Sequence, residues 1–264
     1  MSLNPKISNW HGKVVWLVGA STGIGYALAK LLHTQGARVI VSARSQAKLL
    51  AFTDQHQGSI ALPLDVADSE QIASAVAQIL KTHTQIDVMF YCAGYYTPQT
   101  AAHAQNPFDL HELQQHIALN LTGALTVLHA CLAKTNHVAL VASVAGYQTL
   151  PNALAYAPSK AAMQRLAEGL YIDLHSQGVG VTLINPGFVE TPMTAQNDFH
   201  MPALISADAA ASAILKGMSS GRFEIHFPLR FTFWVKLLSM LPYRIYFAIC
   251  RAMMSTQKSM KALP

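Results

Sequence analysis

The segment Gly19-Ala20-Ser21-Thr22-Gly23-Ile24-Gly25 decides the fold of this 264-residue chain. It follows an apolar run, Val14–Val18, that has the length and composition of a buried strand, and it opens the helical spacing of Ile24–Thr34. Glycines at a strand-to-helix turn let the backbone approach a pyrophosphate, whose charge then lies at a helix N-terminus. A glycine-rich turn can also serve only to pack a helix on a strand, so this segment alone leaves both interpretations open.

Around this turn, short apolar runs alternate with helical segments along the first 190 residues. This alternation is typical of βαβ units and of a parallel sheet covered on both faces. We expect strands at Val14–Val18, Val39–Ser42, Ile60–Pro63, Val88–Cys92, Val138–Ala142 and Val181–Ile184, and a last strand at Phe223–Phe227. We expect helices at Ile24–Thr34, Gln46–Gln55, Ser69–Lys81, Leu110–Ala133 and Ala153–Ser176, and from Ser206 to about Gly217. The sequence predicts an α/β doubly wound parallel sheet in one domain, residues 1–228, with an amphipathic, basic helical extension at residues 229–264.

Polar residues of catalytic type follow the later strands. In Tyr156-Ala-Pro-Ser-Lys160 the tyrosine and the lysine are four residues apart, and therefore lie on one face of a helix. Ser143 comes just after a strand, Asn120 lies within a helix, and the segment 185–191 (Asn-Pro-Gly-Phe-Val-Glu-Thr) follows the sixth strand. Each is unremarkable alone, but their order behind a G-x-x-x-G-x-G turn resembles the short-chain dehydrogenase/reductase family. The resemblance covers about residues 12–227.

This resemblance implies a Rossmann-fold oxidoreductase that moves a hydride between a nicotinamide cofactor and a carbonyl or secondary alcohol. Tyr156 would protonate the developing alkoxide during reduction, and the Ser143 hydroxyl would stabilise it. The Lys160 ammonium would favour the phenolate of Tyr156. The family pattern further implies that Lys160 holds the nicotinamide ribose and that Asn120 positions a proton-relaying water. Cofactor contacts are expected at Gly19, Ser21, Thr22, Gly23, Ile24, Gly25, Arg44, Ser45, Asp65, Val66, Cys92, Ala93, Gly94, Tyr156, Lys160, Pro186, Gly187, Val189 and Thr191.

The residues after the second strand predict that NADP(H) is the cofactor and disfavour NAD. An acidic residue there binds the ribose 2′-hydroxyl of NAD, whereas an arginine accommodates the 2′-phosphate of NADP. This chain has Arg44 at that place and no acid, and the Ser45 and Ser21 hydroxyls could add contacts. Asp65 resembles the family's adenine-side aspartate, with capping of the next helix as the alternative.

Three positions in two segments depart from the family pattern. Its N-N-A-G segment is here Tyr91-Cys92-Ala93-Gly94, and its threonine before the first glycine is here Val18. Both changes affect side chains that would shape the cofactor site, whereas the catalytic residue types are retained.

The loops after the fourth, fifth and sixth strands should border the substrate, because ligands bind at the carboxyl ends of parallel strands. Their apolar residues are Tyr95, Tyr96, Leu150, Phe188 and Met193, together with Pro151, Phe199 and Met201. No arginine or lysine accompanies them, so an anionic substrate would lack a clamp. We therefore expect a small hydrophobic carbonyl or alcohol substrate of lipid-like or acyl-chain type, although such a loop can also be apolar only because it folds down.

The C-terminal segment carries the charge asymmetry of the chain. Residues 222–264 hold seven lysines and arginines against Glu224 alone, whereas the preceding residues are nearly neutral. Arg230, Lys236, Arg244 and Arg251 are interleaved with bulky apolar residues, which does not fit a nucleic-acid track. The longest uncharged run, Leu237–Tyr243, is too short to span a bilayer. Packing on the core or at a dimer interface and peripheral contact with a membrane both remain open.

Other features bound the location and the competing functions. Cys92, Cys131 and Cys250 form no CxxC pair and suggest neither a disulfide framework nor a metal site, which favours a cytoplasmic protein. The N-terminus lacks the apolar core of a signal peptide. The long helices near 110–133 and 153–176 resemble those that build family dimers and tetramers. The alternative from another class is a non-catalytic NADP-binding sensor or scaffold, while epimerase or dehydratase chemistry is disfavoured because too little chain follows Phe227 for a sugar-nucleotide domain.

Overall fold

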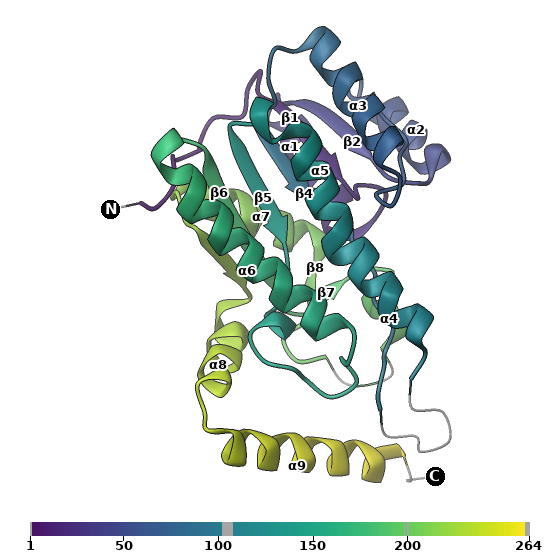
Figure 1. Cartoon of the computed structure of the whole chain (residues 1–264), viewed down its shortest axis with the longest axis vertical. Coiled ribbons are helices and arrows are strands. Elements are labelled where there is room, and N and C mark those ends of the chain that lie inside the picture. The colour runs from purple at the N-terminus through teal and green to yellow at the C-terminus, as the bar shows by residue number, and fades with distance from the viewer. Residues whose placement is uncertain (1, 102–107, 198, 200, 262–264) are drawn as a thin grey trace.

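The computed structural model describes residues 2–101, 108–197, 199 and 201–261. Its centre is a parallel seven-stranded sheet in the order β3-β2-β1-β4-β5-β6-β9 (Figure 1). The strands are β1 (Val14–Val18), β2 (Arg38–Ser42), β3 (Ile60–Ala61), β4 (Val88–Tyr91), β5 (His137–Val141), β6 (Gly180–Pro186) and β9 (Glu224–Phe227). The order reverses between β1 and β4, which creates the crevice where doubly wound sheets bind their ligands.

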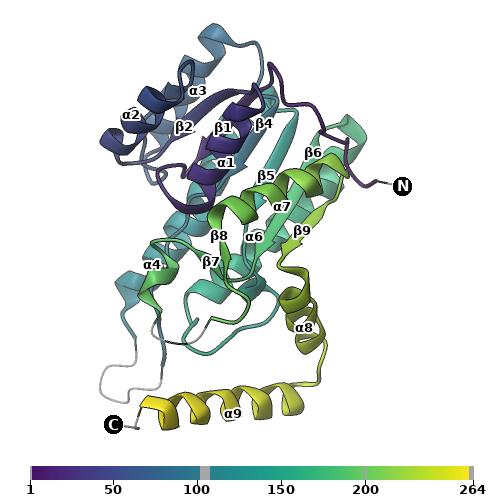
Figure 2. The ribbon, with the colours of Figure 1, turned by 180° about the vertical axis from the view of Figure 1, so that it is seen from behind.

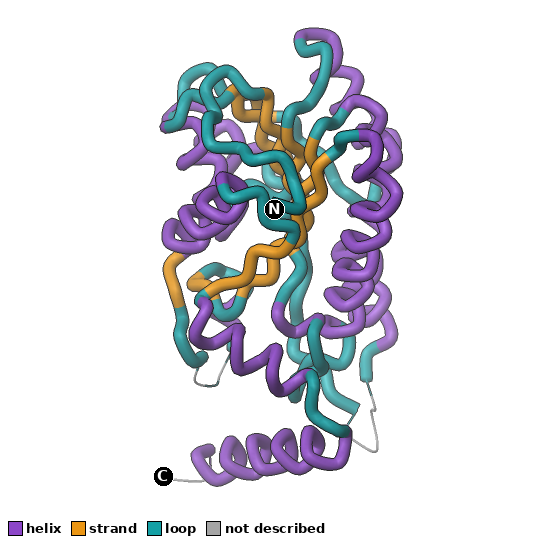
Figure 3. The backbone as a smooth tube through the Cα atoms, turned by 90° about the vertical axis from the view of Figure 1, so that its left-hand side faces the viewer, coloured by secondary structure: helices purple, strands orange, loops and turns teal. Residues whose placement is uncertain are grey.

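Helices cover both faces of this sheet, as Figure 3 shows in a view along its edge. One face packs against α1 (Gly23–Thr34), α2 (Gln46–Gln55) and α7 (Ala207–Ser219). The other packs against α3 (Ser69–Thr82), α5 (Gly123–Cys131) and α6 (Tyr156–Leu174). Successive residues of β1 enter the two cores in turn, Val15 and Leu17 on one side and Trp16 on the other. Burial on both faces explains why the central strands are continuous apolar runs.

The remaining elements extend the carboxyl edge of the sheet. The short strands β7 (Val189–Glu190) and β8 (Ile205–Ser206) pair with each other in a separate two-stranded sheet. Helix α4 (Leu110–Ile117) is joined to α5 by a π-helical turn, Ala118–Thr122. Two C-terminal helices follow β9, namely α8 (Leu229–Ser239) and α9 (Tyr243–Lys261). Figures 1 and 2 show α9 lying across the end of the molecule, beyond the carboxyl ends of the strands.

The predicted fold class is confirmed, and every predicted strand and helix has a counterpart. Ser206 caps α7 by accepting a hydrogen bond from the Ala209 N–H, as its position suggested. Gly36, Gly58 and Gly178 have positive φ and lie shortly after the ends of helical segments, where left-handed backbone is common.

Several predicted elements differ from the structure in extent or continuity. The strand expected at Ile60–Pro63 spans only Ile60–Ala61. The single helix expected over Leu110–Ala133 contains the π-helical turn. The helix expected from Ala153 begins at Tyr156, because the backbone around Ala153 pairs with Gln99.

Within the described residues, the segment Leu110–Lys134 alone is long and apolar enough to cross a bilayer by length and composition. Its residues Ala124, Val127 and Cys131 are buried in the core against the sheet. This is the ordinary environment of a core helix.

Candidate active site

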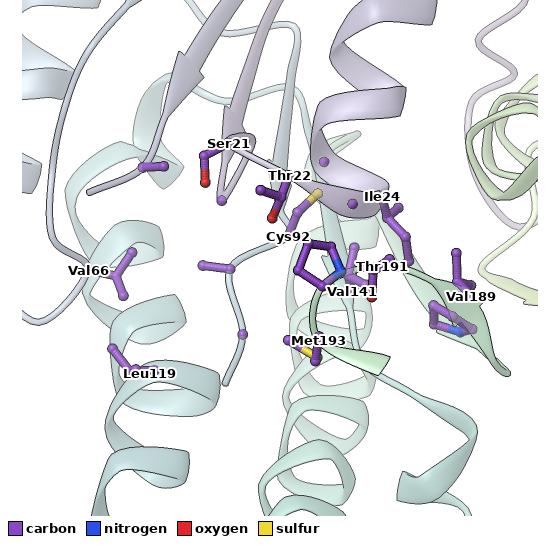
Figure 4. A pocket seen from close by; sticks show the side chains of 18 of the residues that line it. Ser21, Thr22, Ile24, Val66, Cys92, Leu119, Val141, Val189, Thr191 and Met193 are labelled. Atoms are coloured by element: carbon purple, nitrogen blue, oxygen red, sulfur yellow. The ribbon is translucent and has the colours of Figure 1, made fainter. Parts of the chain in front are cut away.

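A cavity of about 470 Å³ opens at the carboxyl ends of the strands, where the strand order reverses. Figure 4 shows Ser21 and Thr22 beside the start of α1, with Val66 and Leu119 on one side and Val189 and Thr191 on the other. All nineteen residues predicted to contact the cofactor line this cavity, including Tyr156 and Lys160. Sequence reasoning missed Ala43, Lys48, Leu64, Leu119, Val141, Ala142, Pro192 and Thr194, which also line it.

The glycine turn permits a close approach of three chain segments. Gly19 has φ of +89°, and a Cβ there would lie 2.3 Å from the backbone nitrogen of Ala93. A Cβ on Gly25 would lie 2.3 Å from the carbonyl oxygen of Gly19. The first turn of α1, whose N–H groups have no partner within the helix, borders the cavity through Gly23 and Gly25. This arrangement fits an anionic pyrophosphate.

Cations gather where the loop after β2 borders the cavity. Arg44 and Ser45 line this end, and Lys48 in the first turn of α2 joins them. The signal that could have identified Lys48 from the sequence is its place in the first turn of the helix that follows Arg44. Two cations and a hydroxyl give this end the chemistry of a phosphate-binding site.

Asp65 lines the same cavity, and the alternative interpretation of it as a helix cap was wrong. Its carboxylate accepts the Ala67 N–H at 3.0 Å, within the turn that precedes α3. The cap of α3 is Asp68, which accepts hydrogen bonds from the N–H groups of Glu70 and Gln71.

Tyr156, Lys160 and Ser143 meet at the other end of the cavity. Tyr156 and Lys160 occupy the first turns of α6, with the Lys160 Nζ 5.7 Å from the centre of the Tyr156 ring. The same Nζ donates a hydrogen bond of 3.0 Å to the carbonyl oxygen of Val141. Ser143 follows β5, its Oγ accepts the Ala145 N–H at 3.1 Å, and its side chain acts to lower the pKa of Tyr156. The structure thus brings three of the four predicted catalytic residues to one wall.

Burial dominates the electrostatics of this group. It raises the pKa of Tyr156 to about 12, although the hydrogen bond from Ser143 acts in the opposite direction. Burial also lowers the pKa of Lys160 to about 8. The loss of solvation therefore affects the pKa of Tyr156 more than the nearby ammonium, whose effect alone was expected from the sequence. At neutral pH Tyr156 keeps its proton and Lys160 stays mostly charged, which suits proton donation to a developing oxyanion.

Asn120, the fourth residue, lies behind the cavity wall rather than on it. It is fully buried in the π-helical turn, where its Oδ1 accepts the Tyr95 N–H at 2.6 Å. Its Nδ2 donates to the Tyr95 carbonyl at 3.0 Å and to Ser159 Oγ at 2.9 Å. A Cβ built on Gly94 would lie 3.4 Å from Asn120 Oδ1 and 3.5 Å from Lys160 Nζ. The amide and the ammonium therefore border the same small space.

The departure from the family pattern at Tyr91 is accommodated by the same turn. The Tyr91 hydroxyl donates a hydrogen bond of 2.6 Å to the carbonyl oxygen of Leu119 in the π-helical turn. A Cβ on Gly123 would lie 2.6 Å from that hydroxyl, so a larger residue there would exclude it. Cys92, the next residue, lines the cavity, and burial raises the pKa of its thiol to about 12. Its thiol is therefore protonated at neutral pH.

Of the five predicted substrate residues, Met193 alone lines the cavity. The Tyr96 ring packs edge-on against Tyr156, with 5.0 Å between ring centres. The Tyr95 hydroxyl donates to Glu112 at 2.7 Å. Leu150 lies in the loop between β5 and α6.

Phe188 belongs to an aromatic cluster formed by the loop after β6 and by α8. Its ring centre lies 5.9 Å from that of Phe199 and 5.5 Å from that of Phe231. A Cβ on Gly187 would lie 2.9 Å from the Phe231 ring, so α8 packs closely on this loop. The contribution of α8 to this side was not visible in the sequence, because Phe231 lies far from the other two rings along the chain.

A buried polar network links α8 to the backbone of Ser143, and sequence reasoning missed it. Gln164 Nε2 donates to the Ser143 carbonyl at 2.9 Å and to Asn185 Oδ1 at 3.0 Å. Asn185 Nδ2 in turn donates to Glu224 Oε1 at 2.8 Å, and Lys236 of α8 forms an ion pair with the same carboxylate.

The carboxylate of Glu224 also accepts a hydrogen bond from the Tyr147 hydroxyl. Burial raises its pKa, but the hydrogen bonds from Lys236, Tyr147 and Asn185 outweigh that effect and hold it below the ordinary value. The network therefore has a charged centre between the C-terminal extension and the serine turn.

Comparison with known proteins gives one consistent result. Residues 13–201 match the family model described as short chain dehydrogenase. A protein described as an uncharacterized oxidoreductase from Myxococcus xanthus (strain DK1622) is 31% identical over 244 residues, 89% of this chain and 95% of the relative.

Two solved structures share the fold. A short chain dehydrogenase from Burkholderia cenocepacia J2315, in complex with NADP, has a TM-score of 0.79 at 22% identity and covers 95% of this chain and 99% of its own. A short chain dehydrogenase/reductase from Burkholderia phymatum, in complex with NAD, has a TM-score of 0.78 at 20% identity and covers 88% of this chain and 94% of its own.

Proposed function

The chain belongs to the short-chain dehydrogenase family, and from this premise we propose that it is an NADP(H)-dependent reductase of hydrophobic ketones or aldehydes. The observation that carries the proposal is the group formed by Tyr156, Ser143 and Lys160 on the wall of a cavity that fits a dinucleotide. The glycine turn, the first turn of α1 and the cations beside β2 supply the complementary features for that cofactor.

The bound nicotinamide supplies the hydride, and the residues of the chain manage the proton and the charge. Tyr156 donates its proton to the substrate oxygen, because its pKa of about 12 keeps the hydroxyl protonated until negative charge develops nearby. Ser143 donates a hydrogen bond to the same oxygen and stabilises it as the charge develops. Lys160 holds a positive charge beside Tyr156. We propose that the proton lost by Tyr156 is replaced through the space that Lys160 and Asn120 border.

The preference for NADP(H) follows from Arg44 and Lys48. Both line the cavity after β2, where the ribose phosphate of NADP would lie. The neighbouring Ser45 and Ser21 have neutral hydroxyl groups, which can donate hydrogen bonds to a phosphate. Two cations there favour a phosphate over a neutral hydroxyl.

The hydrophobic substrate follows from the side chains around Tyr156. Tyr96 packs on the catalytic ring, Met193 lines the cavity, and Phe188 joins the adjoining aromatic cluster. A substrate that presents an apolar chain beside its carbonyl group matches these surfaces better than an anion does.

We further propose a cytoplasmic homo-oligomer. Leu110 of α4, Leu125 of α5 and Ile172 of α6 are exposed by 61%, 45% and 75%. Exposed aliphatic side chains on neighbouring helices are typical of interfaces between subunits. Light scattering coupled to size exclusion should give a mass above that of one chain.

The deciding experiment measures NADPH oxidation with a panel of medium-chain and long-chain ketones, aldehydes and 3-oxoacyl thioesters. Turnover should fall by about 10²- to 10⁴-fold in Tyr156→Phe, the loss expected of a general acid, while NADPH binding is retained. Ser143→Ala should lower turnover in the same way. Turnover that persists in Tyr156→Phe contradicts this mechanism. Tight NADPH binding without turnover on any substrate favours the non-catalytic sensor or scaffold.

A further inference from the structure

The C-terminal helices α8 and α9 contact the rest of the molecule through few side chains. Tyr246 of α9 is 3% exposed, and its hydroxyl donates a hydrogen bond to the Thr149 carbonyl in the loop after β5. On α8, Thr232 and Val235 are buried, and Phe231 packs on Phe188. Both helices therefore adjoin the loops that border the catalytic group, and both have several large side chains exposed within residues 229–253.

That uncovered surface is rich in large apolar side chains. Met240 is 80% exposed, Tyr243 69%, Trp234 65%, Phe233 59% and Phe247 52%. The rings of Phe233 and Trp234 contact each other, and so do those of Tyr243 and Phe247. Large apolar side chains exposed on two successive helices mark an interaction site.

The charge around these side chains has one sign. Residues 225–264 include no aspartate or glutamate, and Arg230, Arg244 and Arg251 are exposed. The one cation of α8 that is neutralised is Lys236, through Glu224 of β9. Arg244 and Arg251 are seven residues apart and lie along one line of α9, next to the line that holds Tyr243 and Phe247. Aromatic and cationic lines side by side are the composition of a helix that lies in a membrane interface.

The charge of this surface also indicates whether a second copy of the chain or a lipid bilayer covers it. A second copy of the chain would bring arginine against arginine, which is unfavourable. An anionic bilayer offers phosphates to the arginines and an interfacial zone in which tryptophan and tyrosine are stable. The helices do not span a bilayer, because α8 has 11 residues and α9 carries arginines within its length.

We propose that the outer surface of α8 and α9 docks on an anionic lipid bilayer and thereby brings the substrate side of the cavity to molecules dissolved in that bilayer. The second half rests on the proposed reductase function, whereas the docking itself does not. Phe231 and Tyr246 carry the connection, since they join the two helices to the loops after β6 and β5. The reductase would then reach membrane-partitioned carbonyl compounds without their release into water.

Docking can be measured without substrate or cofactor. The full chain is floated with vesicles of phosphatidylcholine mixed with phosphatidylglycerol, and with vesicles of phosphatidylcholine alone. We expect binding to the anionic vesicles that weakens with salt. Trp234 reports the geometry, because Trp10 and Trp16 are 2% and 0% exposed. Lipids with brominated acyl chains should therefore quench the emission of Trp234, and Trp234→Phe should remove this quenching while vesicle binding is retained.

Matched variants separate the cationic and the apolar contributions. Arg244→Gln with Arg251→Gln should weaken binding about thirtyfold, since each arginine near an anionic surface contributes about fivefold. Phe233→Ser with Trp234→Ser should weaken it as well. Arg38→Gln with Arg165→Gln, and Leu50→Ser, remove exposed cations and an exposed leucine elsewhere and should bind as the parent does. Circular dichroism checks that each variant is folded.

Three outcomes overturn the proposal: no flotation of the parent, equal binding to neutral and anionic vesicles, or a change from dimer to monomer in Phe233→Ser with Trp234→Ser without any vesicle binding. The last would assign the surface to a second copy of the chain. Because none of these measurements uses NADPH, a failure of docking leaves the reductase proposal untouched, and a failure of turnover leaves docking untouched.

Discussion

The side of the cavity around Gly19, Gly23 and Gly25, called here the nucleotide side, is shaped mainly by backbone, whereas the proposed substrate side beside Tyr156 is bordered by packed side chains. At the nucleotide side, Gly19 and Gly25 let the backbone of β1, α1 and the Ala93 loop approach so closely that a single Cβ would collide. Beside the proposed substrate side, Phe188 and Phe231 pack against each other outside the cavity lining, with ring centres 5.5 Å apart. A site made by backbone restricts its residues to glycine, whereas a site made by packed rings accepts many combinations.

The largest effect should come from adding one methyl group to a glycine that has backbone atoms close by, compared with a glycine that has open space around it. Gly19 and Gly58 have φ of +89° and +85°, but only Gly19 has backbone atoms within reach of a new Cβ. Gly58→Ala should cost about 1–2 kcal/mol of the free energy of unfolding, the ordinary penalty of left-handed backbone, and leave NADPH binding intact. Gly19→Ala should cost more and abolish NADPH binding. Urea unfolding and a titration with NADPH measure both effects, and equal losses in the two variants would refute the claim that close approach matters.

The cationic end of the nucleotide side should show the next largest effect. Arg44→Ala and Lys48→Ala should each weaken NADPH binding about 10- to 100-fold, the loss of a charged hydrogen bond of about 1.5–3 kcal/mol. NADH binding should be nearly unchanged, because only the 2′-phosphate is affected. Titrations of both nucleotides with the two single variants provide the measurement. Equal losses for NADPH and NADH would remove the case for a phosphate clamp.

An effect of similar size should appear at high pH where the two sides meet, in the pH dependence of reduction. Lys160, with a pKa of about 8, loses its charge above that pH, whereas Tyr156, with a pKa of about 12, stays protonated. The value of kcat/KM for reduction should thus be level below pH 7 and fall about tenfold per unit well above pH 8. Oxidation of the alcohol should instead become faster as pH rises, because it needs a proton acceptor. A level reduction profile up to pH 10 would contradict the role given to Lys160.

The difference between the two sides also explains what the sequence could predict. The glycine turn, the alternation of strands and helices and the residues that line the nucleotide side follow from local patterns, because each lies within or next to a strand or helix that the sequence predicts. Tyr156 and Lys160 were found by their spacing on one helix. The upward shift of the Tyr156 pKa was not foreseen, because burial depends on segments that pack from elsewhere in the chain.

The same reason hid the π-helical turn at Asn120 and the network that ends at Lys236. The turn depends on Tyr91 reaching the Leu119 carbonyl, and the network joins Gln164, Asn185 and Glu224 across separate elements. No spacing rule relates such residues, since their proximity exists only after the sheet is assembled.

The smallest effect should come from the network between α8 and the serine turn. Glu224→Gln removes the charge that Lys236 and Asn185 share, and Gln164 then holds the Ser143 carbonyl less firmly. We expect kcat to fall about five- to thirtyfold, which corresponds to about 1–2 kcal/mol for a hydrogen bond to a charged group, with NADPH affinity unchanged. Lys236→Arg should preserve kcat because it keeps the cation, whereas Lys236→Met should resemble Glu224→Gln.

The exposed ion pair between Lys30 and Asp208, 2.8 Å apart and linking α1 to α7, is the matched control. Asp208→Asn removes a carboxylate that is solvated and unconnected to the serine turn, so kcat should stay near the parent value. If Asp208→Asn and Glu224→Gln lower kcat equally, the network acts only through general stability. If Glu224→Gln weakens NADPH binding as much as it lowers kcat, the extension acts on the nucleotide side, and the separation between the two sides of the cavity does not hold.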